Sequence, residues 1–436
     1  MPRIVKRKLL LVSLLTAAGA IALLVLLSCA TVETTGRGAP TRFRVPLGVG
    51  DVAFPLYAAT GRQVLLPGLL DGPVIRRAGD GAWSATWFCE DAVGQARGRG
   101  DRLQIDCAGR RRSFVLDDPG VPAAVAPMPG RVAVLSDLEG NAAFLDKALR
   151  KLRIVDADGD WSYGSGHLVI LGDSVDRGRD VFAVLWRLHG LAVQAGAAGG
   201  AVHVMLGNHE QYLLRTDPTR AHPGHLHALN MMGGYRQAFA ADTVIGRWLR
   251  RQPVALKLGS VLFVHGGVSP AVVRSGLSVE QLNAAMRAYW TRPTTAPSRT
   301  AALDAVLGPA GVTQYRGYFR GLDGRYPAAT SADVQLALEH FGASEIVVAH
   351  TLVEEIERLH GGRVRAVDVN SAESLPEVLV YENGIGRVVD LGVPRNLDPD
   401  EARTFREFSL ADVADRRLLL DMYRDIRRLS ALPYPY

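Results

Sequence analysis

Five short apolar segments of the chain are each followed at once by a side chain that can bind a metal ion. With their polar ends, the segments read VAVLSD, LVILGD, HVMLGN, VLFVHGG and IVVAHT in sequence order. Helical patterns such as AAFLDKALRKL and VFAVLWRLHGLAVQAG lie between them. Strand-like runs that alternate with helices are typical of sheets covered by helices, in which the loops at strand ends converge. We therefore expect these polar ends to meet in one site.

The polar ends supply oxygen and nitrogen donors suited to divalent cations. A single histidine after an apolar run is usually a structural residue, but five such ends in order are difficult to explain by packing alone. The polar residues at or just after these ends that can bind a metal are Asp137, Glu139, Asp173, Asp176, Asn208, His209, His265 and His350.

These residues carry a resemblance to a known family. GDSVDRG, GNHE, VHGGVSP and AHT resemble the motifs of the calcineurin-like metallophosphoesterases, and specifically of their phosphoprotein phosphatase branch. HPGHLHALNMMGGY and TQYRGYFRG are most similar to the bacterial Shewanella-like phosphatases. The resemblance covers about residues 131–393. It implies an α+β fold, in which a central two-sheet β-sandwich is flanked by helices.

The resemblance also implies a role for each residue. Two divalent ions are expected, with manganese favoured and iron, zinc or magnesium as alternatives. Asp173 would bridge a first ion held by Asp137 and Glu139 and a second held by Asn208, His265 and His350. His209, oriented by Asp176, would protonate the leaving oxygen, and Arg177 and Arg316 would bind the phosphate. The implied reaction is hydrolysis of a phosphomonoester by direct attack of metal-bound hydroxide.

Two positions depart from the family pattern: Glu139 replaces the usual His, and Ala349 replaces Gly. A carboxylate in place of imidazole adds negative charge and favours Mn²⁺ or Mg²⁺ over softer ions. The alternatives for Glu139 are an acid near the N-terminus of the following helix and a decayed site.

The first 29 residues read as an export segment. Basic residues at positions 3, 6, 7 and 8 precede an apolar run over residues 9–27. Such a start is typical of a signal, and LLSC resembles a bacterial lipoprotein signal with Cys29 as the lipidated residue. The run is also long enough to be an uncleaved anchor. Both alternatives predict a protein tethered to a membrane of the bacterial envelope, outside the cytoplasm.

Two cysteines remain, Cys89 and Cys107, both in strand-like segments. In an oxidising compartment they can form a cross-strand disulfide, and the alternative is two buried thiols.

Changes in composition divide the rest of the chain. Short β-type runs and turn residues over residues 41–118 predict a small all-β module. The predicted segments are a signal or anchor over 1–29, a tether over 30–40, the β module over 41–118, a Pro-rich linker over 119–130, the metallophosphoesterase domain over 131–395 and a helical tail over 396–436.

Charge argues against nucleic acid as a partner. Four of the six excess positive charges lie in the first 28 residues, so the remainder carries a net charge of only +2. The expected substrate is a phosphoprotein or a small phosphomonoester. The alternatives are a phosphodiesterase or nucleotide hydrolase of the same superfamily, and a surface binding protein that uses the fold as a scaffold. DADGDW over residues 156–161 is interpreted as a hairpin turn, and His222, His225 and His227 as cleft-shaping residues.

Overall fold

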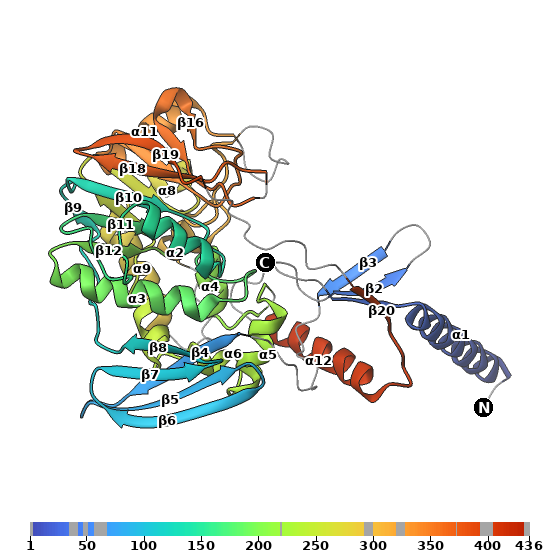
Figure 1. The fold of residues 1–436 in the computed structure, drawn as a ribbon. Helices are drawn as coiled ribbons and strands as arrows, with labels where there is room; N and C mark the ends of the chain where they lie inside the picture. Colours follow the sequence, from blue (N-terminus) through green and yellow to red (C-terminus); the bar gives the residue numbers. More distant parts are fainter. Residues whose placement is uncertain are drawn as a thin grey trace.

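The computed structural model describes most of the chain (Figure 1). The described residues are 3–34, 42–46, 51–55, 68–218, 220–291, 300–319, 328–371, 373–392 and 404–430.

A five-stranded sheet forms one layer of the central sandwich. Its strands lie in the order β12-β11-β10-β18-β19, with β10, β11 and β12 parallel to one another and β18 and β19 antiparallel. Their bounds are β10 Arg131–Leu135, β11 His167–Ile170, β12 Ala201–Val204, β18 Glu377–Glu382 and β19 Ile385–Asp390. The three parallel strands therefore end at one edge.

A six-stranded sheet forms the other layer, in the order β16-β17-β15-β14-β13-β9. Its strands are β9 Val125–Ala126, β13 Ala255–Leu258, β14 Val261–Val264, β15 Glu345–Val348, β16 Glu357–Leu359 and β17 Val364–Ala366. Strands β14, β15 and β17 are parallel neighbours. Strand β9 falls in the segment that the sequence predicts as a linker, and it pairs with β13 at the sheet edge.

The two sheets share one apolar core because alternate strand residues point to opposite faces. In β10, Val132 and Val134 pack toward the six-stranded sheet, while Ala133 and Leu135 pack toward the helices of the other face. Helices α2 Ala142–Lys151, α3 Val181–Ala197, α4 Asn208–Leu214, α5 Pro223–Met231, α6 Tyr235–Ala238 and α7 Val244–Leu249 supply that face.

Helices α8 Pro270–Ser275, α9 Val279–Thr291, α10 Ala301–Leu307 and α11 Ser331–Phe341 pack on the six-stranded sheet, and a short 3₁₀ turn covers His360–Gly362. The predicted sandwich flanked by helices is confirmed.

The predicted β module is built from two small sheets that pack beneath α3 (Figure 1). Its strands are β4 Leu70–Arg77, β5 Ala82–Cys89, β6 Ala92–Arg99, β7 Arg102–Cys107 and β8 Arg110–Val115. Trp186 of α3 donates to Pro73 O at 2.9 Å and packs edge-on against Phe114. A Cys89–Cys107 disulfide joins β5 to β7 across 18 residues. A cross-link of that span stabilises a fold by about 3 kcal/mol.

The two ends of the chain meet in a separate four-stranded sheet, in the order β20-β1-β2-β3. Its strands are β1 Thr31–Thr34, β2 Arg42–Pro46, β3 Asp51–Pro55 and β20 Thr404–Glu407. Residues 31–34, predicted as part of a tether, are therefore paired, and residues 42–46 and 51–55 belong to this sheet and not to the β module. Helix α12 (Val413–Ser430) packs here through Leu419. The tail thus contains a strand as well as the predicted helix.

Helix α1 (Arg3–Ser28) leads directly into this sheet (Figure 1). Its segment Leu11–Ser28 is long and apolar enough to cross a membrane, and the apolar side chains from Leu11 to Val25 are exposed.

Candidate metal centre

The candidate ligands lie where parallel strands of both sheets end. Asp137 and Asp173 follow β10 and β11, and Asn208 opens α4 just after β12. His265 and His350 follow β14 and β15 of the facing sheet. The sandwich therefore brings residues more than 200 positions apart to one edge, as the strand-end pattern predicts.

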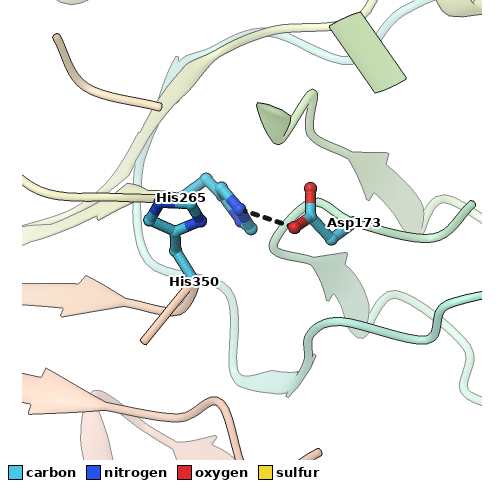
Figure 2. Close-up of side chains that lie close together, drawn as sticks. All are labelled: Asp173, His265 and His350. Carbon is cyan, nitrogen blue, oxygen red and sulfur yellow. Dashed lines mark ion pairs between the residues drawn. The ribbon is translucent and has the colours of Figure 1, made fainter. Parts of the chain in front are cut away.

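Three of these residues converge closely. One ligand atom each from Asp173, His265 and His350 lies within 4.8 Å of the other two, and all three side chains are buried. Figure 2 shows both imidazoles and the carboxylate turned toward one another. The distance from His265 Nε2 is 3.1 Å to Asp173 Oδ2 and 3.0 Å to Asn208 Oδ1. Asn208 thus joins the same cluster.

The donors in this cluster fit a metal ion. His265 Nδ1 is 2.8 Å from Leu171 O, so that nitrogen carries hydrogen and Nε2 faces Asp173 and Asn208. Two acceptor oxygens converge on Nε2, which requires a cation there, either a proton or a metal. Burial alone would lower the pKa of His265, but the Asp173 carboxylate raises that pKa to about 10. Carboxylate, amide and imidazole donors suit manganese, iron or zinc, and a bound metal would displace the proton.

Asp137 and Glu139 lie on the loop after β10 and differ in their surroundings. Asp137 is buried, and its charge helps to raise the pKa of His265. Glu139 Oε1 is 2.7 Å from Arg177 Nη1. Burial raises the pKa of Glu139 to about 7 and outweighs the opposing charge of Arg177. The structure thus pairs Glu139 with the predicted phosphate-binding arginine, and its place as a metal ligand stays a prediction.

His209 lies beside the cluster with its predicted partner. His209 Nδ1 is 3.0 Å from Asp176 Oδ2, and His209 Nε2 is 3.8 Å from Asp173 Oδ2. Burial lowers the pKa of His209, but the charges of Asp173 and Asp176 outweigh that effect and raise it. A protonated imidazole held by a carboxylate can donate a proton to a leaving oxygen.

Arg316 is half-buried and reaches toward His350. Arg316 Nη1 donates to His350 O at 2.5 Å and to Thr351 Oγ1 at 3.1 Å. Arg177 lies on the Glu139 side with its side chain about half exposed. The two predicted phosphate-binding residues therefore reach the centre from different loops.

The backbone at the site is held in an uncommon conformation. Positive φ angles of 47° to 67° occur at Asp137, Glu139, Asp173, Asp176, Arg177 and His350. Non-glycine residues in this region are strained, and such strain concentrates at functional sites. Gly207 permits the close approach of two loops, because a Cβ there would collide with Asp173 Oδ1. Glu210 fixes the same loops by accepting backbone N–H groups of Asp173, Ser174 and Gly207.

The three clustered histidines of the sequence lie outside the metal group. His225 Nδ1 is 2.6 Å from Asp71 Oδ2, which joins α5 to the β module. His222 caps α5, and His227 packs edge-on against Phe88. Within the described ranges, the one group of three or more metal-competent side chains is the Asp173 cluster.

Two further residues beside the centre escaped the sequence analysis. Asp368 is buried after β17, and its charge acts on both Glu139 and Arg177. It follows a strand in the same way as the candidate ligands, so the strand-end rule could have identified it. Tyr212 contacts Asn208 from within α4, and no sequence pattern marks it.

Comparisons with known proteins bear on the family and the fold. The sequence profile described as Calcineurin-like phosphoesterase matches residues 130–354, about half of the chain. Among curated proteins, the chain is 34% identical over 82 residues to Shewanella-like protein phosphatase 2 of Arabidopsis thaliana, covering 19% of this chain and 21% of that protein. It is 33% identical over 136 residues to a symmetrical bis(5'-nucleosyl)-tetraphosphatase of Janthinobacterium sp. (strain Marseille), covering 31% and 43%. The matches thus span less than half of these relatives.

Solved structures match over a longer range. The crystal structure of the cold-active protein-tyrosine phosphatase of a psychrophilic Shewanella species superposes with a TM-score of 0.68 and 31% identity. That match covers 74% of this chain and 97% of the other. A 1.1 Å structure of a cold-active protein tyrosine phosphatase gives a TM-score of 0.66 and 30% identity, with 73% and 97% covered. The chain therefore belongs to the calcineurin-like phosphoesterase family.

Proposed function

We propose that the protein is a phosphatase that uses two divalent metal ions to hydrolyse phosphomonoesters, with phosphoproteins as the substrate class. The observation that carries the proposal is the convergence of Asp173, His265 and His350 beside the His209–Asp176 pair. The similarity to the protein-tyrosine phosphatase of Shewanella supports phosphotyrosine as one substrate.

The proposed ligand set is the one that the sequence predicts. Asp137, Glu139 and Asp173 would hold one ion, and Asp173, Asn208, His265 and His350 the other. When bound, a pair of divalent cations neutralises the phosphate and supplies hydroxide at neutral pH. Glu139 has two carboxylate oxygens, so it can pair with Arg177 and still donate to a metal.

The chain's own groups perform the remaining steps of the proposed reaction. Arg177 and Arg316 would bind phosphate oxygens through their forked N–H groups and hold the ester in place. His209 would give its Nε2 proton to the leaving oxygen as the P–O bond breaks. Asp176 would hold the imidazole through Nδ1, which keeps Nε2 directed at the substrate.

Turnover of two synthetic esters tests the proposal. After chelation, activity on p-nitrophenyl phosphate should vanish and return with Mn²⁺, and the monoester should be cleaved at least about tenfold faster than bis-p-nitrophenyl phosphate. The reason is that paired arginines match a terminal dianionic phosphate. A faster diester reaction would favour the alternative of a phosphodiesterase or nucleotide hydrolase, for which the similarity to the tetraphosphatase is the supporting observation. If added metal restored turnover of neither ester, both enzyme proposals, phosphatase and phosphodiesterase, would be contradicted.

Glu139→His tests the proposed ligand at the position where this chain departs from its family. Imidazole prefers softer ions than carboxylate does, so the ratio of Mn²⁺ to Zn²⁺ affinity should fall by about tenfold. Competition titrations of the metal-free protein measure that ratio. Glu382→His, at an exposed glutamate that pairs with Arg387, is the matched control. Unchanged affinity and selectivity would remove Glu139 from the ligand set.

We also propose that the protein is tethered to a membrane of the bacterial envelope, with its catalytic domain outside the cytoplasm. The exposed apolar surface of α1 supports this proposal. Labelling of cells with a radioactive fatty acid separates the two modes of attachment. Label that disappears in Cys29→Ser indicates a lipoprotein, and membrane-bound protein without label indicates an uncleaved anchor. Protein found only in the soluble fraction would contradict both.

A further inference from the structure

Tyr212 contacts the candidate metal centre although it is not among the proposed ligands. Its hydroxyl lies 2.9 Å from Asn208 Nδ2, one turn earlier in α4, and its side chain is buried with 4% exposed. The amide NH₂ of Asn208 is the donor in this bond. The other branch of the same amide, Oδ1, lies 3.0 Å from His265 Nε2. The nitrogen of the Asn208 amide is thus hydrogen-bonded to Tyr212, while its oxygen faces the cluster.

This orientation matters because the two ends of an amide have opposite character. The oxygen can bind a cation, whereas the NH₂ group only donates hydrogen bonds. A half-turn about the last side-chain bond of Asn208 would present NH₂ to a metal and remove one of its ligands. The two oxygens of an aspartate ligand are equivalent, so its carboxylate can bind a metal in either orientation. A tyrosine hydroxyl can accept from NH₂ or donate to the amide oxygen. In this structure it accepts from NH₂ while Oδ1 lies against His265, and this pair of contacts holds the orientation that binds metal.

The Tyr212 ring is fixed by contacts that do not involve a metal. Its centroid lies 5.3 Å from the His209 ring, which packs edge-on, and the Arg220 guanidinium lies 4.0 Å from the centroid. Cation–π and edge-on contacts of this kind hold a ring in place. The Arg220 carbonyl also accepts the backbone N–H of Arg177 at 2.9 Å. Packing therefore sets the position of the ring, which lies beside the proposed proton donor and beside Arg220, a residue that contacts the backbone of Arg177.

We propose that Tyr212 is a positioning residue for the second metal ion: its hydroxyl orients the Asn208 amide so that Oδ1 is the atom presented to the cation. The inference rests on the proposed function, because it assumes that Asn208 is a ligand. It adds a residue outside the ligand set and assigns the effect to one atom, the phenolic oxygen.

Tyr212→Phe in the full chain tests the role of that atom, since it removes the hydroxyl and keeps the ring. Calorimetric titration of the chelated protein with Mn²⁺ should show one of the two affinities reduced about 10- to 100-fold, as is typical for loss of a residue that supports a ligand. Thermal unfolding without metal should change little. Tyr381→Phe is the matched control, because its buried hydroxyl donates to Glu345 at 2.8 Å within the sandwich core. It should leave both affinities unchanged.

The same substitution in a protein that carries Asn208→Asp separates an effect on the orientation of the amide from a general effect on the stability of the site. In Asn208→Asp the ligand has two equivalent oxygens, so Tyr212→Phe should cost less than about threefold in that background. An equal loss in both backgrounds, or an unchanged affinity in Tyr212→Phe alone, would overturn the inference. A wild-type protein that binds fewer than two Mn²⁺ ions would instead overturn the proposed function on which the inference rests.

Discussion

Asp173→Asn is expected to abolish binding of the metal pair and to reduce turnover of p-nitrophenyl phosphate by at least about 10³-fold. Asp173 is the proposed bridge between the two ions, and its Oδ2 lies 3.1 Å from His265 Nε2. An amide has one oxygen and no charge, so it cannot link two cations as a carboxylate does. Loss of the several kcal/mol that a metal pair contributes to the transition state corresponds to this fall in rate. Metal analysis and steady-state kinetics measure the two effects.

Asp146→Asn is the control for this substitution. Asp146 lies on the exposed side of α2 and pairs with Arg187 at 3.0 Å, so its loss should change neither metal content nor rate. Near-normal metal content together with more than a tenth of the wild-type turnover in Asp173→Asn would show that Asp173 is not the bridge.

His209→Asn should lower kcat by about 10²- to 10⁴-fold while both metal ions stay bound. In the proposed reaction the imidazole, paired with Asp176 at 3.0 Å, would give a proton to the leaving oxygen, and an asparagine side chain cannot supply it. The loss should be larger for an alkyl phosphate than for p-nitrophenyl phosphate, because p-nitrophenolate is a stable anion that leaves without a proton. Comparison of kcat for the two substrates, with metal content measured in parallel, tests the role.

Asp176→Asn provides the graded control. In this variant the His209 imidazole remains, but no carboxylate charge holds it. We therefore expect kcat to fall by about tenfold and the loss still to depend on the leaving group. An equal loss on both esters in His209→Asn would assign His209 to substrate binding or to the support of the metal site, and not to proton transfer.

Much of the sandwich and of the site could be predicted from the sequence because one local pattern determines both. An apolar run followed by a polar residue marks a buried strand and its end, as in β10 and Asp137 or β14 and His265. Parallel strands place such ends at one edge, so the order of motifs is enough to gather Asp173, His265 and His350. The Cys89–Cys107 pair was harder, since spacing alone leaves free thiols as an alternative that only the folded geometry removes.

The remaining features depend on contacts between distant parts of the chain. Strand β1 reads as a tether because TVET is short and polar, and its partner β20 lies some 370 residues away. Strand β9 has two residues inside a Pro-rich segment, which is too short to carry a pattern. The pairing of Glu139 with Arg177 and the contact of Tyr212 with Asn208 depend on rotamers, which the types of residue do not reveal.

The most direct test of the central claim is a crystal structure of the protein soaked in manganese, recorded near the manganese absorption edge. We expect two anomalous peaks about 3.5–4 Å apart. Asp173 should lie between them, with Asp137 on one side and Asn208, His265 and His350 on the other. An absence of anomalous density at this edge of the sandwich would contradict the account. A single ion would also contradict it, if Asp137 and His350 were too far apart to belong to one site around Asp173.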